Sequence, residues 1–115
     1  MKENEVISKF EILSSLMYQS GLGEDIRVHN QAIKKLNRLC VKISHDDKLV
    51  LYPKLLLSEN EKTRLNAASY CLLEKVMIKE AVSELKRILA ESNNEQCRVT
   101  AGIALRLWES QYSSC

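Results

Sequence analysis

Glycine and proline are scarce in this sequence, which contains three glycines and one proline among 115 residues. Folds built from β-strands need many tight turns, and glycine and proline supply the backbone conformations of those turns. Helices need far fewer of these residues, so the composition favours an all-α fold. A chain of this length also has the usual size of one globular domain. We therefore expect residues 1–115 to form a single helical domain.

Apolar residues recur at steps of three and four along the chain, which is the pattern of amphipathic helices. The pattern predicts helices at residues 3–19, 24–44, 46–57, 59–76 and 80–91, and a sixth that ends near residue 111. Gly21 and Gly23 follow the first helix, where glycine commonly adopts the left-handed cap conformation. Residues 112–115 are expected to form a frayed tail.

Particular residues refine the expected helices. Asp46 is positioned to cap the third helix, and Pro53 predicts either a kink or a restart within it. Ser58 and Glu61 have the spacing of a capping box, which places the start of the fourth helix near residue 59. The last helix is apolar on nearly every side. We therefore expect it to lie between neighbours at the centre of the C-terminal half, with Trp108 in the core.

A short pattern recurs where the second, fourth and sixth helices begin. Each copy has an arginine, an apolar residue directly after it, and a leucine nine positions later. The arginines are Arg27, Arg64 and Arg98, and the leucines are Leu36, Leu73 and Leu107. We interpret the second and third arginines as structural residues that can bond carbonyls or an acid on the preceding helix and so fix the angle at which the helices stack. The copies predict three helical hairpins stacked around a continuous core.

The stretch from Ile26 to Trp108 resembles a family of small bacterial HEAT-like helical-repeat proteins of unassigned function. The likeness is strongest in Glu61-Lys62-Thr63-Arg64-Leu65-Asn66-Ala67-Ala68, Ala81-Val82-Ser83-Glu84-Leu85 and Ala104-Leu105-Arg106-Leu107-Trp108. The resemblance implies an α-solenoid of about six antiparallel helices. It also implies a protein-binding role, because such proteins include immunity proteins that bind and block the toxin domains of polymorphic or contact-dependent systems. The resemblance brings no catalytic residues with it.

The sequence contains no recognisable motif for catalysis, metal binding or nucleotide binding. Glycine-rich phosphate loops cannot be written with glycines at positions 21, 23 and 102 alone. His45-Asp46-Asp47 is interpreted as a polar loop with a capping aspartate, and His29 as a structural or surface residue. We therefore expect no catalytic residue, no metal and no cofactor, and we do not expect an enzyme.

The cysteines and the hydropathy pattern indicate the compartment. The four cysteines are widely spaced, which fits neither a zinc site nor a disulfide framework. Cys40 and Cys71 are expected in the core, and Cys115 is expected to be exposed. No apolar stretch is long enough to cross a membrane, and the acidic N-terminus does not resemble a signal peptide. These features predict a cytoplasmic protein that makes no contact with a membrane.

Charge is unevenly distributed along a chain whose net charge is +2. Residues 1–26 contain two basic and five acidic side chains, whereas residues 27–54 contain seven basic and two acidic ones. Lys34, Arg38 and Lys42 recur every four residues beside Lys35, so they form a basic stripe on the second helix. The stripe is either a partner-binding surface or a solvated outer face. The acidic residues that could contact a basic partner are those of the first 26 residues, or Glu74, Glu80 and Glu84.

These observations predict a non-catalytic protein-binding module. In its most concrete form, the chain is an immunity protein that binds a bacterial toxin domain, expected to be a nuclease. One alternative is a HEAT-like module that binds nucleic acid through the basic stripe, although a net charge of +2 disfavours dedicated phosphate binding. Another alternative is a regulatory or oligomeric subunit whose last helix is covered by another chain. The protein is expected to be a monomer or a weak dimer.

Overall fold

The computed structural model describes residues 2–18 and 25–113, and these residues form six α-helices and no β-strand. The helices are α1 (Glu3–Met17), α2 (Asp25–Lys42), α3 (His45–Leu56), α4 (Glu61–Glu74), α5 (Ile78–Glu91) and α6 (Glu95–Ser113). The all-α prediction is confirmed. The predicted glycine turn at Gly21 and Gly23 lies outside the described residues, and α6 continues two residues beyond its predicted end.

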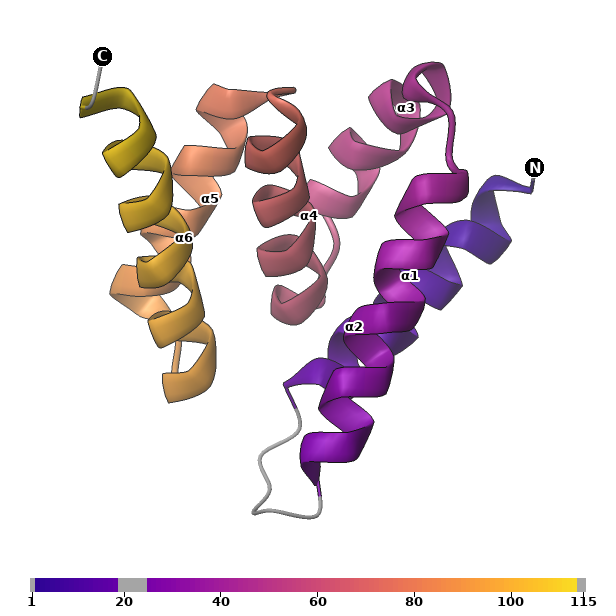
Figure 1. The fold of residues 1–115 in the computed structure, drawn as a ribbon, viewed down its shortest axis with the longest axis horizontal. Helices are drawn as coiled ribbons and strands as arrows, with labels where there is room; N and C mark the ends of the chain where they lie inside the picture. Colours follow the sequence, from indigo (N-terminus) through magenta and orange to yellow (C-terminus); the bar gives the residue numbers. More distant parts are fainter. Residues whose placement is uncertain (1, 19–24, 114–115) are drawn as a thin grey trace.

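Helix α4 occupies the centre of the arrangement, because it packs against α1, α3, α5 and α6. Figure 1 shows α1 and α2 on one side of it and α5 and α6 on the other. Its small side chains explain the close approach of so many neighbours, since Ala67, Ala68 and Cys71 have no exposed surface. Larger core residues fill the space around them, including Phe10 and Leu85.

The prediction that the last helix lies at the packed centre is wrong. Only one face of α6 is buried, through Cys97, Ala101 and Leu105, because its neighbours α4 and α5 cover that face alone. Val99 and Ile103 on the opposite side are about half exposed. The sequence pattern could not reveal this exposure, because it does not specify how many helices surround a given helix.

Two predicted caps are also wrong. Ser44 caps α3, since its Oγ accepts a hydrogen bond of 3.1 Å from the Asp47 amide, and Asp46 lies exposed in the first turn. Asn60 caps α4 through a bond of 3.0 Å from the Lys62 amide. The helix therefore starts two residues later than expected, and Ser58 accepts from the Asn60 amide instead of forming a capping box.

The connection between α4 and α5 contains two residues with left-handed backbone conformations. Lys75 has φ 58° and Met77 has φ 48°. The amide of Val76 donates to the Cys71 carbonyl at 2.9 Å, which closes the end of α4 in the manner of a Schellman motif. The break therefore lies at residues 75–77 and not at the predicted 77–79, whereas α3 continues through Pro53 without a restart.

The turns before α4 and α6 are built in the same way. In each, a serine hydroxyl accepts a 3.1 Å bond from an asparagine amide two residues later, and that asparagine caps the helix. The arginine of the repeat then donates from Nη1 to the serine carbonyl at 2.6 Å, which joins Arg64 to Ser58 and Arg98 to Ser92. Both arginines therefore bond a backbone carbonyl, as predicted, but that carbonyl belongs to the turn before their own helix. The acid that Arg64 bonds is Glu84, which lies on the following helix α5 and not on the preceding one.

Candidate partner-binding surfaces

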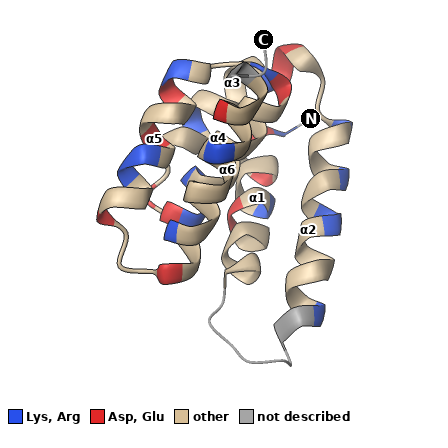
Figure 2. Cartoon of the chain, turned by 60° about the vertical axis from the view of Figure 1, so that its left-hand side comes forward, with Lys and Arg blue, Asp and Glu red and all other residues tan. Residues whose placement is uncertain are grey.

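The basic stripe predicted on the second helix is exposed along its whole length. Figure 2 shows its blue segments recurring along α2, on the edge of the molecule. Lys34, Lys35, Arg38 and Lys42 are all exposed, but they do not share one surface feature. Lys35, Arg38 and Lys42 line a hollow between α1 and α2, and Lys34 is not among its lining residues.

This hollow combines basic side chains with an apolar floor. We call it the basic groove, and its lining residues are Lys9, Ile12, Leu13, Lys35, Arg38, Leu39 and Lys42. Its volume is about 400 Å³. Lys9 was not predicted as a site residue, because it is distant in sequence from the stripe and joins it only when α1 packs against α2.

The three acidic residues suggested by the sequence do not form one free surface. Glu74 accepts hydrogen bonds from Lys48 and from the Tyr52 hydroxyl. Glu84 lies 3.3 Å from Nε of Arg64 and 3.5 Å from Nε of Arg87, and its side chain is largely buried. Glu80 is exposed in the first turn of α5. Two of these carboxylates therefore stabilise the fold through internal ion pairs.

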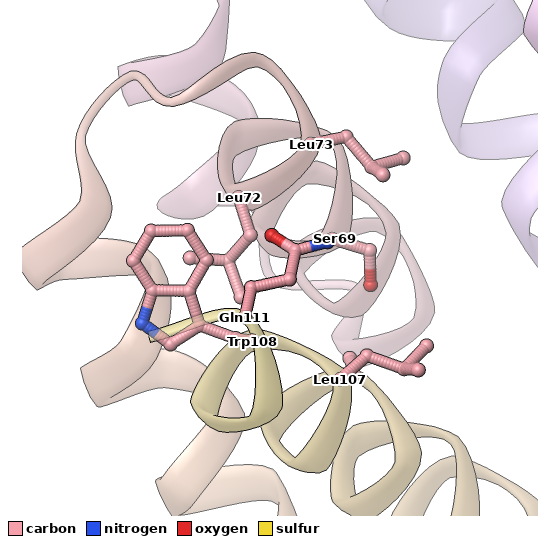
Figure 3. A pocket seen from close by; sticks show the side chains of 7 residues that line it. Ser69, Leu72, Leu73, Leu107, Trp108 and Gln111 are labelled. Carbon is pink, nitrogen blue, oxygen red and sulfur yellow. The ribbon is translucent and has the colours of Figure 1, made fainter. Parts of the chain in front are cut away.

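A second surface feature lies between α4 and α6 and is mostly apolar. We call it the apolar hollow, and its lining residues are Ser69, Leu72, Leu73, Ala104, Leu107, Trp108 and Gln111. Its volume is about 190 Å³. In Figure 3, the side chains of Leu73 and Leu107 point to one side of the hollow and the indole of Trp108 lies at the other. Trp108 is half-buried, because one part of its side chain packs against the core and another part lines the hollow.

The apolar hollow contains two of the three repeat leucines, and the sequence analysis did not identify it as a site. Leu73 is 74% exposed and Leu107 is 62% exposed, whereas Leu36 in the same register is 1% exposed. The three leucines therefore occupy the same position in the repeat, but two of them are exposed and one is buried. A large exposed leucine costs free energy in water, and adjacent apolar side chains of this kind are typical of interaction surfaces.

Among the residues considered for chemistry, His29 has a structural contact, His45 is exposed and the described cysteines are buried. The Nδ1 atom of His29 lies 2.5 Å from the Met17 carbonyl oxygen, so this ring joins α2 to the end of α1. His45 is exposed in the first turn of α3. Cys40 and Cys71 are buried as predicted, and Cys97 is buried as well, whereas Cys115 lies outside the described residues. In the part of the chain that the structure describes, no three His, Cys, Asp or Glu side chains are grouped to hold a metal ion.

Tyr70 also stabilises the fold. Its hydroxyl donates to Oδ1 of Asn37 on α2, and its ring contacts Phe10 edge-on with centroids 6.2 Å apart. It therefore links α4 to both α1 and α2.

Two further findings concern the membrane and the similarity of the chain to known proteins. Among the described residues, none of the helices has the length and apolar character needed to span a membrane. Comparison of the chain with family models, with curated proteins and with solved structures finds no match. Similarity to known proteins therefore assigns neither a family nor an activity to this chain.

Proposed function

We propose that this chain is a non-catalytic module that binds another protein through the apolar hollow. The observation that carries the proposal is the pair of exposed leucines, Leu73 and Leu107, beside the half-buried Trp108. Large apolar and aromatic side chains around a hollow are typical of the residues that contribute most to protein–protein binding. A partner side chain inserted there would remove this apolar surface from water.

The proposed architecture is a HEAT-like stack of helical hairpins. The repeated serine, asparagine and arginine contacts before α4 and α6 support it, because they give two helices the same start. These two helices also pack against each other. In such stacks, neighbouring repeats together form a binding surface that no single repeat provides.

In its most concrete form, the proposed module is a cytoplasmic immunity protein that blocks a toxin domain with one-to-one stoichiometry. This version rests on the sequence resemblance described above. A basic nuclease partner would need acidic side chains on the inhibitor. Glu80 is exposed and could contact such a partner, whereas Glu74 and Glu84 already have basic partners within the fold.

Self-association is a second candidate function, and the exposed side of α6 favours it. Val99, Ile103 and Leu107 are spaced four residues apart, so they form an apolar stripe along the helix. A second copy that covered this stripe would make the protein an oligomeric subunit. Light scattering coupled to gel filtration, over a range of protein concentrations, distinguishes a self-associating chain from a monomer.

The experiment that tests the proposed function compares partner capture by two matched variants. The tagged protein is co-expressed with the genes adjacent to its own, and complexes are washed at low and high salt. Leu73→Asp with Leu107→Asp should lose a partner that the wild type retains at one-to-one stoichiometry. Leu57→Asp, which alters a similarly exposed leucine after α3, should retain it.

Two outcomes would contradict the proposed function. Equal capture by the double variant and by Leu57→Asp would exclude the apolar hollow as the binding surface. Recovery of mixed nucleic acid that is removed by high salt, with no protein at fixed stoichiometry, would favour phosphate binding instead.

A further inference from the structure

The basic groove has cations on both of its sides and exposed apolar surface between them. Lys9 comes from α1, and Lys35, Arg38 and Lys42 come from α2. Within residues 2–18 and 25–113, none of these four cations forms an ion pair, whereas Lys48, Lys54 and Arg64 each have a carboxylate partner. The charges of the groove are therefore available to an external ligand.

The apolar residues of the groove define the kind of ligand that would fit. Ile12 is 60% exposed, and Leu13 and Leu39 are half-buried beside it. A ligand that carried only negative charge would leave the Ile12 side chain in water. A ligand with apolar side chains along its centre and acidic ones along its edges would contact both parts of the surface.

The cations on the α2 side of the groove span a distance that corresponds to two turns of a helix. Lys35 and Lys42 lie seven residues apart on α2, and a rise of about 1.5 Å per residue separates their backbones by roughly 10 Å. Two turns of a partner helix have the same length. Apolar residues at steps of three and four would contact the floor, with glutamates or aspartates on either side of them.

We infer that the basic groove binds an acidic amphipathic helix of a partner protein. The inference rests on the proposed protein-binding function. It adds the basic groove to the apolar hollow as a second surface that contacts the partner, and it specifies which side chains of the partner bind there. The apolar side chains of that helix pack on Ile12, Leu13 and Leu39, and its carboxylates pair with the four cations.

A protein ligand fits this groove better than a nucleic acid. Its described lining residues include no aromatic ring, and proteins that hold single-stranded nucleic acid stack bases on such rings. The apolar floor also offers nothing to a phosphate. In addition, the net charge of +2 is small for a surface whose affinity would come from counterion release.

The test uses synthetic peptides of about three helical turns and measures binding by fluorescence anisotropy. The probe peptide has leucines at helical spacing flanked by glutamates. One control peptide replaces the glutamates with lysines, and another replaces the leucines with serines. A single-stranded DNA oligonucleotide of equal charge is the fourth ligand. The probe peptide should bind at least about tenfold more tightly than each of the other three, because it alone matches both charge and apolar floor.

Variants of the protein assign the binding to the groove. Lys35→Glu with Arg38→Glu should weaken binding of the probe peptide by about tenfold or more, and Ile12→Ser should weaken it by several-fold. Lys34→Glu is the matched control, because Lys34 is exposed on the same helix but does not line the groove, and binding should change by less than about twofold.

The inference is overturned if the oligonucleotide binds as tightly as the probe peptide, or if the lysine peptide does. It is also overturned if Lys34→Glu weakens binding as much as the groove variant does. None of these results affects the capture experiment with Leu73 and Leu107, which uses a different surface, so failure of this inference and failure of the proposed function can be distinguished.

Discussion

The hydroxyl of Tyr18 donates a hydrogen bond of 2.9 Å to Oδ1 of Asn66, which lies 48 residues further along the chain. The amide nitrogen of Asn66 donates in turn to Oγ of Ser14 at 2.9 Å. All three side chains are buried. The bonds therefore join the C-terminal end of α1 to the central helix α4 through side chains that are almost entirely removed from solvent.

We expect Asn66→Ala to destabilise the protein by about 2–3 kcal/mol, because it leaves two buried hydroxyls without this partner. Tyr18→Phe should cost about 1–2 kcal/mol. Urea denaturation followed by circular dichroism measures both effects. Tyr70→Phe is the matched control, since its bond to Asn37 is exposed, and it should cost less than Tyr18→Phe. An equal loss in the two phenylalanine variants would contradict the importance of burial.

The two repeat arginines should differ in their contribution to stability. Arg64 bonds both the Ser58 carbonyl and Glu84, whereas Arg98 bonds the Ser92 carbonyl. We expect Arg64→Ala to lower the free energy of unfolding by about 2 kcal/mol and Arg98→Ala by about 1 kcal/mol. Arg64→Lys should not recover the free energy of unfolding that Arg64→Ala loses, because lysine lacks the planar arrangement of donors. Full restoration by lysine in urea denaturation would show that charge alone is sufficient.

The cap of α3 can be tested by two neighbouring substitutions. Ser44→Ala removes the side chain that accepts from the Asp47 amide, and we expect a loss of about 1 kcal/mol in the free energy of unfolding. Asp46→Asn removes only a charge near the helix N-terminus and should cost about 0.3 kcal/mol. If thermal denaturation gave the larger loss for Asp46→Asn, Asp46 rather than Ser44 would be the cap.

All six helices could be predicted from the sequence, because the spacing of apolar residues within each segment is itself the signal of an amphipathic helix. Cap positions were less predictable, since Ser58 and Asn60 both have side chains that can cap a helix, and only tertiary contacts select one. The same limitation applies to the surfaces. The stripe on α2 was identified because its residues are close in sequence, whereas the contribution of Lys9 depends on how α1 and α2 pack.

The buried cysteines should be unreactive in the native protein. Burial raises the pKa of the Cys40 thiol to about 11, and it raises the pKa of Cys71 to about 12. Burial also raises the pKa of Cys97 to about 11. At about pH 8, thiols with these pKa values remain protonated and are poor nucleophiles. In a Cys115→Ser variant, we expect no rapid labelling by iodoacetamide until urea is added. Rapid labelling of the folded variant, detected by mass spectrometry, would contradict this expectation.

Stability should decrease at alkaline pH. Burial raises the pKa of Tyr18, Tyr52 and Tyr70 above the usual tyrosine value, and the hydrogen bond to Glu74 raises that of Tyr52 further. A group whose pKa is higher in the folded protein stabilises the fold below the unfolded pKa, and this contribution is lost as pH rises towards the folded one. For tyrosine the unfolded pKa is about 10, and for cysteine it is about 8.5.

We therefore expect the urea midpoint to fall from about pH 9 upwards, because the unfolded chain releases protons that the folded chain retains. In a Tyr112→Phe variant, which removes the fourth tyrosine, absorbance at the tyrosinate band should rise with unfolding and not before it. Tyr18→Phe should reduce the slope of stability against pH above about 10, since it removes one of the buried phenols. A urea midpoint that stays constant to about pH 11, or tyrosinate formation near pH 10 in the folded Tyr112→Phe variant, would contradict the burial of the Tyr18 and Tyr52 side chains.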